Sequence, residues 1–268
     1  MDAGRIDRYC VSLRELLLNV FAVAPARLFA PDWTDSQVFD ISAKLPEGAT
    51  QEQLPAMFQS LLEDRFGLAF HRESKEGPIN ALVVAKGGLK VKAALPQSAQ
   101  PAWVAAAAAV SGPYGNGFIG GIRFRSITVP NSTGEPMFVL QTPSMGFVRR
   151  SDTGGAAGGG IIHYEAPCIT FEGLADLAVI AGNNMLDLAV VDMTGLKGRY
   201  QVNLNVSMAD LYAAISEGPL RVEPATLHKA QLKVVQDGLK KLGLQLEPRK
   251  APVGAVIIDR LEKTPTAN

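Results

Sequence analysis

The chain repeats part of its own sequence, and this repeat restricts the fold more than any other feature. Residues 9–16 resemble residues 167–174, and the two cysteines of the chain, Cys10 and Cys168, occupy the same place in these segments. Two more pairs follow in the same order, namely residues 39–44 with 200–205 and residues 65–70 with 241–246. Three matching blocks in one order indicate a duplicated structural unit.

Each copy carries the same two predicted helices. Ser12 and Glu15 form a capping box at the start of the first helix, and Thr170 caps its counterpart in the second copy. Thr50 and Gln53 cap the second helix of the first copy. Apolar side chains recur at helical spacing after each cap, which predicts one buried face per helix.

Strands complete each copy. Gly67 and Gly243 suit the left-handed residue that ends a helix. Two strands then form a predicted hairpin in each copy: residues 68–73 with 80–86, and residues 244–249 with 254–261. The repeated unit is therefore strand-helix-strand-helix-strand-strand. We predict an α+β fold with this unit duplicated, mixed and antiparallel sheets, and helices packed on one face.

The repeat also predicts the domain organisation. Residues 1–94 form the first repeat and residues 161–268 the second, with small insertions around residues 210–224. Residues 95–160 form a connecting insertion that is rich in alanine and glycine and contains edge strands. Its glycine run at residues 154–160 lacks the Lys-Ser/Thr pair that follows a phosphate-binding loop, which favours a plain linker.

Charge and hydropathy exclude two classes of partner. The 26 basic residues balance the 26 acidic residues, whereas nucleic-acid-binding proteins show a basic excess or a basic stripe. The longest apolar run, residues 103–110, is far shorter than the roughly 20 residues of a membrane span. No signal peptide is recognisable at the N-terminus. The chain is therefore either a soluble protein without a leader or the mature form of an exported protein.

Several segments together resemble a known family. They are residues 39–44 (FDISAK), residues 61–68 (LLEDRFGL) with the charged run at 71–76, residues 81–86 (ALVVAK), residues 191–200 (VDMTGLKGRY) and residues 256–259 (VIID). This set is similar to an uncharacterised soil-bacterial family, a domain of unknown function abundant in acidobacterial genomes. Its members usually carry an export signal, and the domain sometimes follows antibiotic-sensor metallopeptidase regions. The resemblance covers nearly the whole chain except residues 95–160, and it implies an exported or periplasmic origin without implying an activity.

His71 and Glu73 form the first candidate site. They lie two residues apart on a predicted strand, so both side chains leave the same face. An imidazole beside a carboxylate can act as a base with its orienting group, or as two metal ligands. The alternative is an exposed strand face within a charged run.

Ser144 is the second candidate. The segment Thr142-Pro143-Ser144-Met145-Gly146 differs from the G-x-S-x-G nucleophile elbow only at its first residue, and an apolar run precedes it. Asp187, Asp192 and His228 follow in the order that a hydrolase triad needs. An elbow must open a helix, however, and residues 147–150 soon run into glycines. A turn that contains proline and serine explains the motif without catalysis.

Asp187 and Asp192 form a candidate metal site. They lie in loops rich in side-chain oxygens, and such loops bind divalent metals such as Ca²⁺, which takes six to eight oxygen ligands. No EF-hand pattern is present. The alternative is an Asx-type turn that leads into the strand at Tyr200.

The equivalent positions of Cys10 and Cys168 leave two readings. If the two copies pack about a pseudo-twofold axis, the thiols meet and a disulfide joins the halves. Otherwise both thiols are reduced and buried.

Our leading hypothesis is an exported, non-catalytic module that binds a small molecule or an envelope protein, with its ligand in the groove between the copies. The alternative is an ester or lactone hydrolase acting, for example, on an acyl-homoserine lactone. The attack on the carbonyl would then be carried either by Ser144 or by a water activated by a metal that the acidic loops hold. A third hypothesis is a structural component of an envelope assembly.

Overall fold

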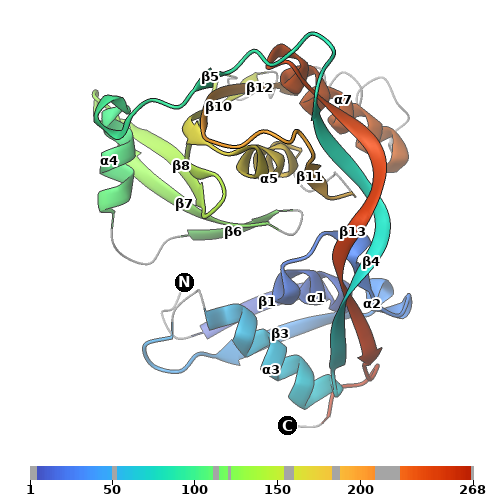
Figure 1. The fold of residues 1–268 in the computed structure, drawn as a ribbon. Coiled ribbons are helices and arrows are strands. Elements are labelled where there is room, and N and C mark those ends of the chain that lie inside the picture. The colour runs from blue at the N-terminus through green and yellow to red at the C-terminus, as the bar shows by residue number, and fades with distance from the viewer. Residues whose placement is uncertain are drawn as a thin grey trace. The chain divides into compact units, whose positions relative to one another are not determined.

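The computed structural model describes residues 5–49, 53–110, 115–119, 122–153, 160–182, 188–208 and 224–266, and only the backbone of residues 115–118 and 224–228. The chain divides into two compact units. The first unit is Met1–Gly77 with Lys250–Asn268, and the second unit is Pro78–Arg249. Both units combine helices with strands in mixed and antiparallel sheets, which confirms the predicted α+β class (Figure 1). The predicted domains, at 1–94, 95–160 and 161–268, are defined by the repeat and stay a prediction.

In its described residues the first unit contains a two-stranded antiparallel sheet, three α-helices and a short 3-10 helix, Pro25–Arg27. Its elements are β1 (Arg5–Ser12), α1 (Leu13–Phe21), β2 (Leu28–Phe29), α2 (Trp33–Ser36), β3 (Val38–Lys44) and α3 (Leu54–Phe66). The Ser12 hydroxyl accepts a hydrogen bond of 3.1 Å from the backbone N–H of Glu15, which confirms the predicted cap. Apolar faces of α1 and α3 pack together around Leu17 and Leu62 and form the core of the unit.

The ends of α3 agree only in part with the sequence prediction. Gly67 ends the helix in the left-handed conformation (φ 58°), as predicted. The helix begins at Leu54, later than a cap at Thr50 requires, and Gln53 makes no capping side-chain hydrogen bond. Thr50 itself lies outside the described residues. A proline in the first turn favours this start. The first backbone N–H groups of a helix have no partner within the helix, so the N–H that proline lacks is not needed there.

The predicted hairpins at the end of each copy are wrong. The first is one continuous strand, β4 (Ala69–Val84), and the second is likewise β13 (Leu244–Arg260). The two strands are hydrogen-bonded neighbours in a four-stranded sheet of order β11-β4-β13-β2. Gly77 and Pro78 therefore stay extended instead of turning. The short strand β11 (Val190–Asp192) pairs with β4 only from Asn80 onward. Pairing with β11 therefore does not require the backbone N–H that Pro78 lacks.

The second unit is built on a seven-stranded sheet of order β5-β12-β10-β9-β8-β7-β6. The strands are β5 (Lys92–Ala93), β6 (Gly115–Ile119), β7 (Ile122–Pro130), β8 (Pro136–Thr142), β9 (Gly146–Asp152), β10 (Ile161–Ile169) and β12 (Tyr200–Ser207). All the pairs between them are antiparallel. In Figure 1 this sheet curves around helix α5 (Phe171–Ala181), whose side chains are buried on almost every face.

Side-chain alternation shows which helix covers which face of this sheet. On β8 and β9, Leu140 and Val148 belong to the main core with α5 and α7 (Pro224–Lys241). The neighbouring Val139 and Phe147 point to the other face, where they pack with Trp103 of α4 (Ala102–Ala109). Helices α5 and α7 therefore pack on one face of the sheet, as predicted, whereas α4 covers the opposite face.

A similar series of elements occurs twice in the described chain, although α2, between β2 and β3, has no counterpart among the described residues between β11 and β12. The series β1-α1-β2-β3-α3-β4 has its counterpart in β10-α5-β11-β12-α7-β13. The pairing register of β1 shifts between Arg8 and Val11, and that of β10 shifts between Ala166 and Ile169, so both irregularities fall at the equivalent cysteines. This recurrence agrees with the repeat in the sequence, and its origin by duplication stays a prediction.

Candidate functional site

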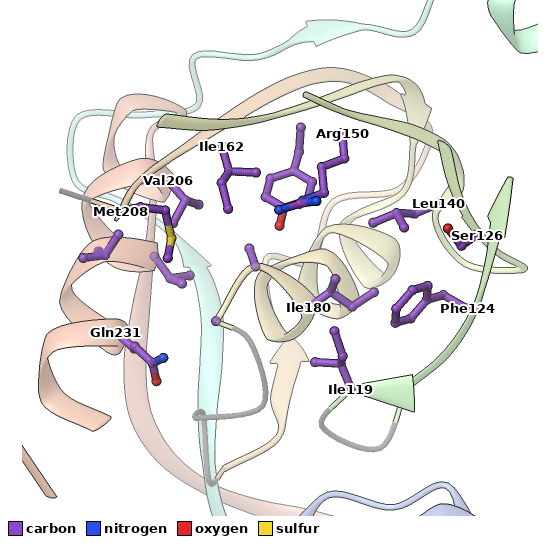
Figure 2. A pocket seen from close by; sticks show the side chains of 15 residues that line it. Ile119, Phe124, Ser126, Leu140, Arg150, Ile162, Ile180, Val206, Met208 and Gln231 are labelled. Carbon is purple, nitrogen blue, oxygen red and sulfur yellow. The ribbon is translucent and has the colours of Figure 1, made fainter. Parts of the chain in front are cut away.

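A pocket of about 380 Å³ lies inside the second unit, between the curved sheet and helices α5 and α7 (Figure 2). Most of its lining is apolar and comes from five strands and the two helices: Ile119, Phe124, Leu140, Ile162, Ile180, Ala181, Gly182, Val206, Met208, Val234 and Val235. Ligand pockets of proteins span about 300–1,000 Å³, so this one has the size for a small ligand.

Arg150 and Tyr164 bring polar groups into this apolar surrounding. They are opposite residues on β9 and β10, and the guanidinium is hydrogen-bonded to the phenol. Burial raises the pKa of Tyr164, the nearby carboxylate of Asp152 raises it further, and the charge of Arg150 opposes this rise. The phenol therefore stays protonated at neutral pH and is available as a hydrogen-bond donor.

Gln231 of α7 supplies a second polar group. Its side chain is only 3 % exposed, and its Oε1 atom has no hydrogen-bond partner within the described residues. Figure 2 shows Gln231 and Arg150 reaching the pocket from different sides. A buried polar atom without a partner costs free energy, so this amide is an expected contact point for a ligand.

Ser144 lies in a different hollow of the second unit, of about 490 Å³. Its Oγ donates a hydrogen bond to Asp176 Oδ2 and lies 2.9 Å from Thr142 Oγ1. Arg123 and Glu172 also line the hollow, and burial lowers the pKa of the Arg123 guanidinium.

The turn that carries Ser144 joins the antiparallel strands β8 and β9. A nucleophile elbow instead joins a strand to a helix, so the backbone here is that of a hairpin turn. His228 belongs to α7, but its side chain lies outside the described residues. Whether Ser144 is catalytic stays a prediction.

His71 and Glu73 lie on the part of β4 that belongs to the first unit, and both side chains are exposed. The ring Nδ1 of His71 lies 2.9 Å and 3.0 Å from the two carboxylate oxygens of Asp259 on β13. Glu73 faces Lys75 at 4.0 Å. The carboxylate that contacts His71 is therefore that of Asp259, far away in the sequence, and a catalytic or metal-binding role of His71 and Glu73 stays a prediction.

Asp192 forms the turn that was the alternative to a metal site. Its Oδ1 accepts hydrogen bonds from the backbone N–H of Thr194 at 2.9 Å and from the Thr194 hydroxyl at 2.8 Å. Asp187 lies outside the described residues. Within the ranges that the structure describes, no group of three or more His, Cys, Asp or Glu side chains is arranged to hold a metal ion. A calcium site at Asp187 and Asp192 stays a prediction.

Arg150 and Gln231 were not predicted from the sequence as site residues, although each interrupts an apolar pattern. Arg150 follows Val148 on the inward face of β9, where an apolar residue is expected. Gln231 lies on the same stripe of α7 as Val234 and Val235, at helical spacing. A polar residue on a buried stripe is the signal that could have found them.

In the part of the chain that the structure describes, no helix combines the length and the apolar character that crossing a membrane requires. No curated protein and no solved structure matches the chain. A family model described as "Protein of unknown function (DUF3738)" matches residues 14–261. This match confirms the resemblance to an uncharacterised family, while the acidobacterial origin and the export stay predictions. Because the match covers most of the chain, the protein belongs to the DUF3738 family of proteins of unknown function.

Proposed function

We propose that this protein is an exported, non-catalytic module that binds a small molecule in the pocket of the second unit. The observation that carries the proposal is Gln231, a buried residue that lines an apolar pocket and whose Oε1 atom has no hydrogen-bond partner among the described residues. Native proteins pair nearly all buried polar groups. A bound ligand that donates a hydrogen bond supplies the missing partner.

The rest of the pocket supports the same function. Apolar walls with a few convergent polar groups are typical of small-molecule sites, and Arg150, Tyr164 and Gln231 are such groups. These side chains come from β9, β10 and α7, which are regular elements of the core. Residues on regular elements hold a defined geometry, as a binding site requires.

The export in this proposal comes from the family resemblance alone. Fractionation of the bacterium that makes the protein tests it, because an exported protein is recovered outside the cytoplasmic fraction. An envelope protein as the partner, or a structural role in an envelope assembly, is the competing proposal. It predicts self-association or co-purification with envelope proteins, and no response to small ligands.

Filling the pocket tests the binding function. Val206 is buried and lines the pocket, so Val206→Phe adds bulk where the ligand would lie. The probe is N-phenyl-1-naphthylamine, a neutral apolar dye whose fluorescence rises in apolar surroundings. We expect the dye to fluoresce with the wild type and to lose most of that signal with Val206→Phe. Val38 is exposed, so Val38→Phe serves as a matched control that keeps the signal. Equal dye binding by Val206→Phe and the wild type would contradict the proposal.

The hydrolase is the second candidate, and the contact between Ser144 and Asp176 beside the hollow is what favours it. Its weakness is chemical, since a carboxylate is a poor base for a serine hydroxyl and the described contacts of Ser144 include no imidazole. Hydrolysis of p-nitrophenyl acetate and of an acyl-homoserine lactone, measured with and without EDTA, tests it. Turnover that Ser144→Ala abolishes would favour serine chemistry, and turnover that EDTA abolishes would favour a metal.

A further inference from the structure

We propose that the pocket of the second unit takes an amphipathic carboxylic acid, with its carboxylate on Arg150 and Tyr164 and a hydrogen-bond donor at its other end on Gln231. This inference rests on the proposed binding function and specifies its ligand. Three features of the lining lead to it, namely the charge of the polar groups, the direction of their hydrogen bonds and the apolar surface between them.

The charge of the lining selects an anion. Among the pocket-lining residues that the structure describes, Arg150 is the single ionic side chain and none is a carboxylate. Asp152, two residues further along β9, is exposed and is not one of the lining residues. A guanidinium beside apolar walls has lost part of its hydration, and a carboxylate that accepts two parallel N–H bonds compensates for that loss.

Tyr164 strengthens the same preference. Its phenol is buried and already lies within hydrogen-bonding reach of Arg150. A carboxylate bound to the guanidinium is therefore placed where the neutral phenol can donate a further hydrogen bond to it. An ammonium group at this position would face the like charge of the Arg150 guanidinium.

Gln231 determines the chemistry of the other end. Its Oε1 atom can only accept a hydrogen bond, so the ligand must present an N–H or O–H group. Figure 2 shows the amide and the guanidinium on different sides of the pocket, with Ile180, Ile162 and Val206 around the space between them. A ligand that reaches both groups needs an apolar body between two polar ends.

The experiment compares four probes of one chain length that differ only in their polar ends: 8-hydroxyoctanoate, octanoate, 1-octanol and octylamine. Binding to the full chain is measured by titration calorimetry and by the shift in melting temperature. We expect 8-hydroxyoctanoate to bind best, octanoate next, and octanol at least about tenfold more weakly than octanoate, because a hydrogen-bonded charge is lost. Octylamine should bind no better than octanol.

Two variants assign the ends of the ligand. Arg150→Gln should reduce octanoate binding to the level of octanol, and Arg249→Gln, which removes an exposed arginine outside the pocket, should leave it unchanged. Gln231→Leu should abolish the advantage of 8-hydroxyoctanoate over octanoate. Gln236→Leu, on the same helix but outside the pocket lining, should keep it. If Arg150→Gln does not fold, Arg150→Lys retains the charge without the paired N–H groups and should bind octanoate at an intermediate strength.

The outcomes separate this inference from the proposed function. If octanol or octylamine binds as well as octanoate, and Val206→Phe abolishes the binding of all of them, the pocket binds small molecules and the carboxylic-acid inference is overturned. If neither the four probes nor the dye binds, both proposals are overturned. An acid preference that Arg150→Gln leaves intact would also overturn the inference, since the acid would then be held elsewhere.

Discussion

Arg150 and Tyr164 lie directly opposite each other on the antiparallel strands β9 and β10, and both side chains line the same pocket. Opposite residues of an antiparallel pair stand side by side on one face of the sheet. This is why the guanidinium reaches the phenol even though fourteen positions of chain separate the two residues. The charge of Arg150 therefore acts on the pKa of the Tyr164 phenol, and the ionisation of that phenol can be measured.

The first prediction concerns the pH dependence of stability. Because burial raises the pKa of Tyr164 in the folded protein, the unfolded chain loses the phenolic proton at a lower pH. The free energy of unfolding should therefore fall as the pH rises above about 10 and continue to fall up to the raised pKa. Tyr164→Phe should remove this part of the loss, as measured by urea unfolding between about pH 8 and pH 11. Tyr9 is 73 % exposed, and Tyr9→Phe is the control that should keep it. An identical pH profile for Tyr164→Phe and the wild type would contradict the prediction.

The second prediction concerns the close approach of α5 to the turn that carries Ser144. A Cβ atom at Gly173 would lie 2.4 Å from the carbonyl oxygen of Ser144 and 2.7 Å from the Cα atom of Met145. Both are backbone atoms, so the helix or the turn must move. Gly173→Ala should lower the free energy of unfolding by about 1–3 kcal/mol. Gly87→Ala, where a Cβ meets nothing within 4 Å, should have little effect in the same urea titration. Equal stability of the two variants would show that the turn can move at no cost.

The third prediction concerns Thr170, which has two roles at the start of α5. Its hydroxyl accepts a hydrogen bond of 3.0 Å from the backbone N–H of Gly173 and donates one of 3.1 Å to the carbonyl of Ser144. Thr170→Ala loses both bonds and should cost about 1–2 kcal/mol of unfolding free energy. Thr170→Ser keeps the hydroxyl and should recover most of that loss. A serine variant as unstable as the alanine variant would mean that the methyl group, rather than the hydroxyl, stabilises this position.

The fourth prediction concerns the equivalent cysteines. Cys10 is exposed, Cys168 is half-buried, and both are free thiols in the structure. A thiol reagent such as DTNB should therefore react with the native protein in a fast phase and a slow phase. Cys10→Ser should remove the fast phase and Cys168→Ser the slow one. Oxidised protein that shows no thiol after denaturation would instead support the disulfide between the two copies.

The features that the sequence predicted correctly depend on residues close to one another along the chain. Ser12 and Thr170 cap helices through N–H groups three residues away, and Gly67 ends α3 because only its own backbone must become left-handed. Such interactions depend on a few neighbouring side chains, so one sequence is enough to find them.

The errors and omissions concern contacts between distant residues. The segment around Gly77 and Pro78 has the composition of a turn, yet it stays extended because β4 pairs with β13 instead of folding back on itself. In the same way, Ser144 is hydrogen-bonded to Asp176, and His71 to Asp259. No spacing in the sequence predicts either pair. A hydrogen-bond partner far along the chain is chosen by the packing of whole elements.

The sequence by itself therefore determined the α+β class, the helix caps at Ser12 and Thr170, and the family, because these depend on local conformational preferences and on patterns along the chain. The pocket was decided only by the tertiary structure. Arg150, Tyr164 and Gln231 become one site because the sheet curves around α5 and brings β9, β10 and α7 to the same space. That curvature comes from packing many side chains into one core, and no single segment of the chain contains it.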